Sequence, residues 1–133
     1  MASAEQSVGL LGELLVTGAL VRLGFTVLTP ILPESYDMFV ISKKGRASRL
    51  QVKSTQKPVK HRAATRYSFT AKRGNGANNY SKQHADFLVF VALDNGSCWI
   101  IPTAPNLPLR FNIPPDSTQS KYYRYTEAWG QLE

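Results

Sequence analysis

A small group of side chains in the first half of the chain has the chemistry needed to hydrolyse a phosphodiester bond. Asp37 precedes Gln51 and Lys53, with thirteen residues between Asp37 and Gln51. Mg²⁺ is a hard ion that takes oxygen ligands and completes its shell with water and substrate phosphate. Asp37 would be its charged ligand, with further oxygens from the Gln51 side chain and the Val52 backbone carbonyl. Lys53 would orient or help deprotonate the attacking water, or stabilise the pentavalent phosphorane.

Two strands joined by a turn would bring these residues together. Residues 36–42 and 47–54 are rich in apolar and β-branched residues and are predicted strands, and the polar residues 43–46 between them predict a turn. Alternate residues of a strand share a face, so Gln51 and Lys53 project together. A neighbouring strand lies about 5 Å away, close enough for a carboxylate at the start of the first strand to reach the same point.

A second carboxylate is expected from an N-terminal helix. Residues 3–6 have capping-box spacing, and the apolar run that follows predicts a helix over residues 4–23 that ends at Gly24. Glu13 lies among leucines in this run, where an unpaired acid would be costly, so we expect it in the site. The run also carries Arg22 and has no basic leader before it, which favours a buried helix over a signal or membrane segment.

The order of these motifs resembles a known superfamily. Gly12-Glu13, Tyr36-Asp37 and Gln51-Val52-Lys53 follow one another as helix, strand and strand. This set resembles the PD-(D/E)XK nucleases, which include Holliday-junction resolvases, restriction enzymes and a class of group I intron homing endonucleases. The greatest likeness is to the intron homing endonucleases, which have a similar chain length and also use Gln in place of the usual acid.

The resemblance implies a catalytic set, a fold and an assembly. The set is Glu13, Asp37, Gln51 and Lys53, with Mg²⁺ as cofactor. The fold is a single α/β nuclease domain over residues 1–133, with a mixed central sheet flanked by helices. It also implies a homo-oligomer, a dimer or a tetramer, because cutting both strands takes two active sites. Tyr36 replaces the usual Pro, and Gln51 is consistent with either a specialised enzyme or one that has lost activity.

The charge distribution predicts double-stranded DNA as the partner. The formal net charge is +7, and no Asp or Glu occurs from Met38 to Ala85, where twelve of the sixteen Lys and Arg residues lie. Such a one-sided basic segment is typical of phosphate binding. Asn78, Asn79 and Tyr80 are candidates to read bases, although polar loop residues more often satisfy turns. The predicted DNA-binding residues are Lys57, Lys60, Arg62, Arg66, Lys72, Arg73, Asn78 and Asn79.

The rest of the chain completes the fold prediction. Residues 55–81 are polar and basic and predict a loop-rich insertion with one strand at 67–70. Residues 87–93 and 98–102 predict a hairpin. A proline-rich irregular stretch follows, and a short final helix around 123–131 would place Trp129 against the core.

The lone Cys98, in an apolar setting, predicts a buried thiol in a reducing compartment, the cytoplasm, and no membrane partner is expected. The leading functional hypothesis is a Mg²⁺-dependent endonuclease that cuts duplex DNA at a specific sequence. A junction resolvase and a non-catalytic DNA-binding module are the alternatives.

Overall fold

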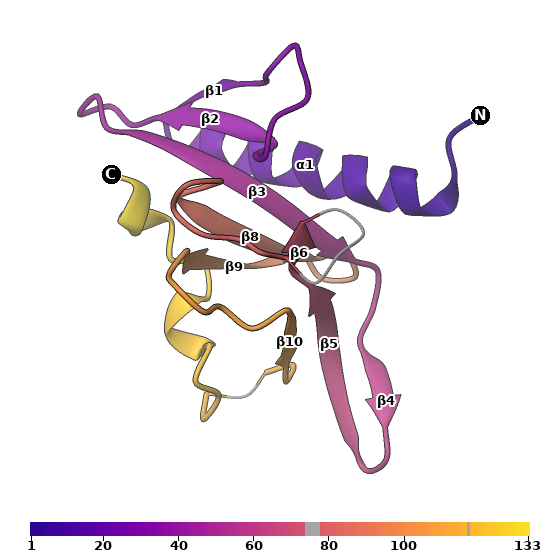
Figure 1. Cartoon of the computed structure of the whole chain (residues 1–133). Helices are drawn as coiled ribbons and strands as arrows, with labels where there is room; N and C mark the ends of the chain where they lie inside the picture. Colours follow the sequence, from indigo (N-terminus) through magenta and orange to yellow (C-terminus); the bar gives the residue numbers. More distant parts are fainter. Residues whose placement is uncertain (74–77, 117) are drawn as a thin grey trace.

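A mixed five-stranded sheet forms the centre of the molecule (Figure 1). The computed structural model describes residues 1–73, 78–116 and 118–133. Neighbouring strands in this sheet are antiparallel except at its middle, where β3 and β8 run parallel. This arrangement confirms the predicted mixed sheet. In spatial order the strands are β1 (Thr26–Leu28), β2 (Met38–Ile41), β3 (Ala47–Thr55), β8 (Phe87–Ala92) and β9 (Ser97–Pro102).

The N-terminal helix α1 (Ala4–Arg22) covers one face of this sheet. Its capping box is present: the Ser3 side chain accepts from the Gln6 backbone amide, and the Gln6 side chain accepts from the Ser3 amide. Gly24 follows the helix with a φ of +94°, a conformation that favours glycine. The predicted helix is therefore confirmed to within one residue at its C-terminal end.

Only one stripe of α1 is buried, which corrects the expectation of a buried helix. Gly12, Val16 and Leu20 face the sheet, whereas Leu10 and Leu14 are more than half exposed. α1 is long and apolar enough to cross a membrane. Core helices of soluble proteins often have the same length and composition. The helix has apolar residues on almost every side, so sequence periodicity could not identify the buried stripe.

The other face of the central sheet is covered by strands rather than by helices. β5 (Ala64–Thr70) pairs with β10 (Arg110–Ile113) and with β4 (Val59–His61) to form a three-stranded antiparallel sheet. Phe69 stacks on Phe90 of the central sheet, with ring centroids 4.6 Å apart. The sequence predicted a mixed sheet flanked by helices; in the described residues α1 flanks one face, and the buried rings of β5 and β10 cover the other.

The segment predicted as a loop-rich insertion contains four strands. Besides β4 and β5, it holds β6 (Lys72–Arg73) and β7 (Asn78–Asn79), while residues 74–77 of the predicted insertion lie outside the described residues. Every residue of β4 is exposed. A strand with no buried face needs no alternation of apolar and polar residues, so nothing in the sequence indicated this strand. β10 was also missed, because prolines on both sides of it favoured irregular structure.

The C-terminal segment packs against the core as predicted, although its helical form differs. Trp129 is buried in the same core cluster as Val16 and Leu20. The single expected helix is replaced by two 3₁₀ helices, η1 (Tyr123–Tyr125) and η2 (Trp129–Leu132). Cys98 is a buried free thiol, as the sequence predicted.

Candidate active site

Asp37 lies where β2 separates from β3. The ladder between these strands ends at the pair Met38 and Leu50, one residue after Asp37. The Asp37 amide donates to the Leu50 carbonyl at 2.8 Å, and carboxylate Oδ2 of Asp37 accepts from the Val52 amide, also at 2.8 Å. The bond from the Val52 amide to the Asp37 carboxylate thus replaces the next backbone hydrogen bond between the two strands. Its other oxygen, Oδ1, has no hydrogen-bond donor within the described part of the chain.

β3 presents Gln51 and Lys53 on one face, as its sequence predicts. Leu50 and Val52 are buried in the core beneath α1, while Gln51 and Lys53 alternate with them and are partly exposed. The N–H and C=O of one residue in an extended strand point to the same side. The Val52 carbonyl is therefore directed to the side of β3 on which Asp37 binds the Val52 amide.

Glu13 approaches the same place from α1. The helix packs closely on β3 at Gly12, where an added Cβ would lie only 2.9 Å from the Cβ of Ser54. This close approach holds Glu13 near enough for the charge of Asp37 to affect its titration. The structure thus brings together Glu13 of α1, Asp37 just before β2, and Lys53 of β3.

The pKa values of these groups are shifted toward the neutral forms, mainly by burial. Burial raises the pKa of Glu13, and the negative charge of Asp37 raises it further. Burial also raises the pKa of Asp37, against the opposing effects of the Val52 amide and the Lys53 charge. Burial lowers the pKa of Lys53, and Asp37 opposes that shift. Such shifts occur where charged groups are gathered for a chemical role.

Tyr80 completes the surroundings of Lys53, and the sequence reasoning did not place it there. Its buried ring lies beneath the ammonium group, with Lys53 Nζ 5.4 Å from the ring centroid. Burial raises the pKa of the Tyr80 hydroxyl, and the charge of Asp37 adds to the shift while Arg73 opposes it. No sequence spacing connects Tyr80 with Lys53, because the contact forms only when the segment after β7 returns to the sheet.

A cavity of about 390 Å³ opens beside the two carboxylates. Glu13 and Asp37 form one part of its wall, and the loop between β1 and β2 forms the rest. Within that loop Ile31 is fully exposed. The cavity gives the carboxylates access to a substrate from outside. Its loop residues are Thr29, Pro30, Ile31, Leu32, Pro33, Glu34 and Tyr36.

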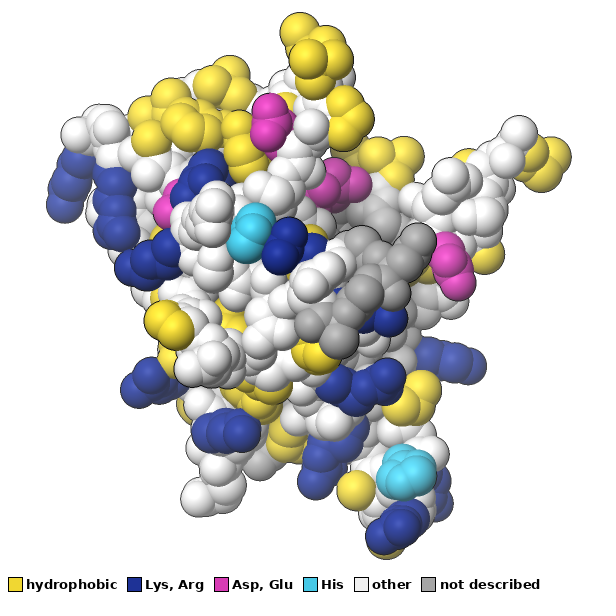
Figure 2. Space-filling view, viewed as in Figure 1, with side chains coloured by type: hydrophobic (Ala, Val, Ile, Leu, Met, Phe, Trp, Pro, Cys, Tyr) yellow, Lys and Arg dark blue, Asp and Glu magenta, His cyan; other side chains and the backbone are white. Residues whose placement is uncertain are grey.

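The predicted DNA-binding residues lie on the segment that follows the site along the chain. Lys57 is in the short connection from β3 to β4, and Lys60, Arg62 and Arg66 belong to the β4–β5 hairpin. In Figure 2, basic side chains lie over the lower part of the molecule, where this hairpin extends, and also over the upper left, whereas the acidic side chains visible from this side lie in the upper half. Arg62 lies at the tip of the hairpin with a φ of 57°.

The remaining predicted DNA-binding residues lie in β6 and β7, and two of them also make internal contacts. Arg73 Nε donates to the Asn79 carbonyl at 2.7 Å, and Asn79 Nδ2 donates to the Leu107 carbonyl at 2.7 Å. Asn79 thereby attaches β7 to the loop before β10. Lys72 and Asn78 are exposed. A role in DNA binding for these four residues stays a prediction.

Some basic residues of the acid-free segment stabilise the fold instead. Arg49 forms an ion pair with Asp86, with Nε 3.2 Å from Oδ2, and also donates to the carbonyls of Lys82 and Gln83. Arg46 donates to the Gln131 and Glu133 carbonyls and so holds the C-terminal segment. Asp86, which also accepts from the Arg49 backbone amide, therefore has a structural role.

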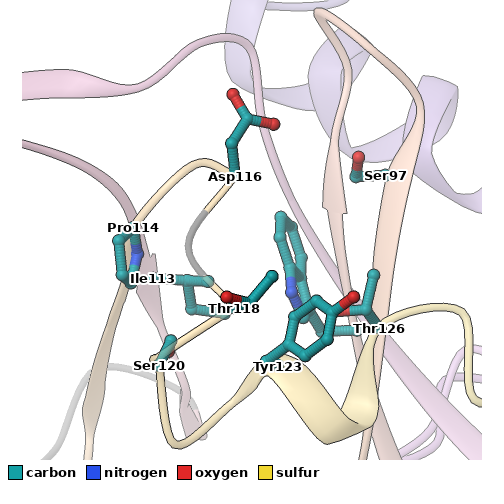
Figure 3. A pocket seen from close by; sticks show the side chains of 9 residues that line it. Ser97, Ile113, Pro114, Asp116, Thr118, Ser120, Tyr123 and Thr126 are labelled. Carbon is teal, nitrogen blue, oxygen red and sulfur yellow. The ribbon is translucent and has the colours of Figure 1, made fainter.

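A second cavity lies far along the chain from these residues, where the start of β9, the end of β10 and η1 meet (Figure 3). Its volume is about 280 Å³. Asp116 and Tyr123 are among its lining side chains, and the Asp116 carboxylate points away from the Tyr123 ring in this view. Its lining includes none of Glu13, Asp37 or Lys53, so it is separate from the candidate active site.

Comparison with known proteins gives a family and a fold. The family model for the PD-(D/E)XK endonuclease matches residues 3–131, almost the whole chain. Among solved structures, the chain is similar to a bacterial homing endonuclease, I-Ssp6803I, with a TM-score of 0.79 and 19% identity, over 98% of this chain and 93% of that one. No curated protein matches the chain by sequence. Because this family model covers almost the whole chain, the chain belongs to the PD-(D/E)XK endonuclease family.

Proposed function

We propose that this endonuclease requires a divalent metal, with Mg²⁺ as the physiological ion, and cuts duplex DNA at a defined sequence. The observation that carries the proposal is the fixed Asp37 carboxylate. One of its oxygens is held by the Val52 amide and the other is free of protein donors among the described residues. A carboxylate oriented in this way on the edge of a strand, next to a lysine with a lowered pKa, suits phosphodiester hydrolysis.

The donor set fits Mg²⁺ better than a softer metal. The described residues include no group of three or more His, Cys, Asp or Glu that could hold an ion. The available donors are instead the Asp37 carboxylate, the Gln51 side-chain oxygen and the Val52 carbonyl, with Glu13 nearby. Mg²⁺ prefers such hard oxygen donors and retains water in the rest of its shell. When bound, the ion would polarise the scissile phosphate and make a coordinated water more acidic.

The side chains around the metal would have different roles in hydrolysis. Because burial lowers the pKa of Lys53, its ammonium group gives up a proton more readily than a solvated lysine. Lys53 can therefore help remove the proton of the attacking water, or stabilise the added negative charge on the phosphorane. Glu13 adds a second carboxylate beside Asp37, and Gln51 keeps the site less negative than a third acid would.

Phosphate binding would come from the basic segment after β3. Lys57, Lys60 and Arg62 follow β3 directly, on the connection and the hairpin that extend from the body of the molecule. Neutralising several phosphates releases counterions, so log affinity should fall by about 0.9 per phosphate for each unit of log salt. A flat salt dependence would contradict this assignment.

Homing-type cleavage is the subtype that we favour. A solved structure with the same fold is that of a homing endonuclease, and the chain covers nearly all of it. Junction resolution is the enzymatic alternative. Binding without cutting is the alternative that Gln51 keeps open, because a Gln ligand contributes less charge to a metal site than the usual acid.

A homo-oligomer is part of the same proposal, because cutting both strands takes two active sites. The exposed stripe of α1, which includes Leu10, Leu11, Leu14 and Val21, is suited to packing against a second copy of the chain. Leu14→Glu should reduce the mass measured by light scattering after gel filtration. Lys44→Glu, on an exposed turn, is the control.

One assay tests the activity and separates the alternatives. The wild type and Asp37→Asn are incubated with plasmid, linear duplex and a four-way junction, with Mg²⁺ or with EDTA. Discrete duplex products that depend on Mg²⁺ and on Asp37 are expected. Products from the junction alone would favour a resolvase, and binding of DNA without products under all conditions would favour the non-catalytic module.

A further inference from the structure

The small sheet β10–β5–β4 has one face inside the protein and one face outside. Tyr67 and Phe69 of β5, with Phe111 and Ile113 of β10, point into the core. The strand register places the alternate residues on the opposite face, and a cavity of about 470 Å³ lies over them. We refer to these residues as the outer face: Val59, His61, Arg66, Ser68, Arg110 and Asn112.

The shape of this sheet is that of a narrow ribbon. β4 pairs only with the first half of β5, at residues 64–66, and β10 only with the second half, at residues 67–70. The outer face is therefore two strands wide along its length, with strands about 5 Å apart. The major groove of B-DNA is about 12 Å wide and admits a two-stranded ribbon. Figure 1 shows the β4–β5 end of this ribbon projecting from the body of the molecule.

The chemistry of the outer face exceeds what phosphate binding needs. Arg66 and Arg110 can each donate two hydrogen bonds to the O6 and N7 atoms of guanine, and an Asn such as Asn112 can pair with N6 and N7 of adenine. Asn112 lies directly opposite Ser68, and Arg110 donates to the Ser68 hydroxyl at 3.3 Å, so these groups form one connected polar row.

Val59, more than half exposed at the other end of the ribbon, offers the apolar contact that a thymine methyl group takes. Attraction of phosphates does not account for an exposed valine on this face. No member of the outer face is acidic. The face therefore combines the side-chain types that distinguish base pairs.

We infer that the outer face reads base pairs in the major groove of the DNA substrate. The inference rests on the proposed function and names the residues that give it sequence specificity. Lys60 lies on the opposite face of β4 and Arg62 at the tip of the hairpin, so both are left to contact phosphates.

The chain also limits where the recognised bases lie. Val59 lies six positions after Lys53, a span of about 20 Å at most for an extended chain. Successive base pairs are about 3.4 Å apart along the duplex. The bases read at the near end of the ribbon should thus begin within roughly six base pairs of the scissile phosphate.

The test is a selection from duplexes that carry a randomised segment. The wild type, Arg66→Ala, Asn112→Ala and Lys60→Ala are incubated in parallel with the library in Ca²⁺, which like Mg²⁺ prefers oxygen ligands. Bound duplexes are separated by gel shift and sequenced. All three changes are at sites outside the buried core, and circular dichroism checks that each variant folds.

The wild type should select a consensus sequence. Arg66→Ala and Asn112→Ala should each lose preference at one or two adjacent positions, by roughly 5- to 150-fold, and keep the rest of the consensus. Lys60→Ala, the matched control from the other face of the ribbon, should weaken binding to all sequences alike.

Two results would overturn the inference. One is that Arg66→Ala and Asn112→Ala weaken binding uniformly with the consensus unchanged, as Lys60→Ala is expected to do. The other is a wild type that binds and cuts duplex DNA with no sequence preference, which would leave the nuclease activity standing and remove the reading face. Failure of the wild type to bind duplex DNA at all would instead reject the proposed function, and the inference with it.

Discussion

The carboxylate of Asp37 accepts a hydrogen bond from the Val52 amide at 2.8 Å, where the ladder between β2 and β3 would otherwise continue. This bond joins the carboxylate to the strand that carries Gln51 and Lys53. It also holds a negative charge in a place where burial raises its pKa. Holding the ionised carboxylate here therefore costs stability, and we propose that this fixed carboxylate is the metal ligand.

The first prediction concerns the stability that the protein loses when Asp37 is ionised. Asp37→Asn keeps an oxygen that can accept from Val52 but removes the charge. When folding raises the pKa of a carboxyl, the ionised form destabilises the folded protein, and this cost is fully present above the folded pKa. Below about pH 4 the carboxyl is protonated in both the folded and the unfolded state, and the cost disappears. In EDTA, Asp37→Asn should therefore raise Tm at pH 7 and change it little at pH 3. Thermal unfolding followed by circular dichroism measures both, and an equal loss of Tm at the two values would contradict the prediction.

The second prediction compares Asp37 with Lys53 in binding and cutting. Both Asp37→Asn and Lys53→Ala should lower cleavage by several orders of magnitude. Without metal they should shift duplex affinity in opposite directions, because the first removes a charge that repels the scissile phosphate and the second removes one that attracts it. Gel-shift titrations in EDTA measure the affinities. Cleavage at the native rate by both variants would place the site elsewhere.

The third prediction concerns Gln51, which lies on the same face of β3 as Lys53. Gln51→Glu adds a negative charge beside the proposed metal and should lower the Mg²⁺ concentration needed for half-maximal cleavage. Gln51→Leu has a similar volume without the oxygen and should cut far more slowly. Initial rates across a Mg²⁺ series measure both effects. Full activity in Gln51→Leu would remove this residue from the site.

The fourth prediction concerns the ring beneath Lys53. Tyr80→Phe keeps the ring and should cut at close to the native rate, since the contact with Lys53 Nζ is to the ring face. Tyr80→Leu opens the ammonium group to water. Because burial is the larger influence on the pKa of Lys53, that pKa should rise, and the limb of the pH–rate profile that it controls should move to higher pH. An unmoved profile in Tyr80→Leu would show that the ring does not position Lys53.

The fifth prediction concerns the close packing of α1 on β3. Gly12→Ala places a methyl group against Ser54, 2.9 Å from its Cβ, and should destabilise the protein by about 1–3 kcal/mol while displacing Glu13 and slowing cleavage. Gly18→Ala is the matched control, because it meets no atom within 4 Å and should stabilise the same helix by up to about 1 kcal/mol.

Urea unfolding of Gly12→Ala, Ser54→Gly and the double variant completes this test. The double variant should recover much of the lost stability, since the two residues touch and their effects are not additive. Additive losses would mean that the packing at Gly12 does not depend on Ser54.

The sequence alone determined the features that depend on local interactions. The capping box at Ser3, the stop at Gly24 and the β8–β9 hairpin each involve residues only a few positions apart. The pairing of β2 with β3 follows from a short turn, so the approach of Asp37 to Lys53 could be anticipated from spacing and alternation.

Features that join distant segments could not be predicted from the sequence. The parallel pairing of β3 with β8 places Gln51 opposite Leu88, and Tyr80 meets Lys53 across 26 intervening residues. β10 joins β5 about forty positions away, and that pairing turns a polar segment, which by itself resembles a loop, into a sheet with a buried face and an outer face. The physical reason is that a strand is stabilised by hydrogen bonds to neighbouring strands and by burial of one face. Both depend on residues outside the strand, so the strand's own sequence does not predict them.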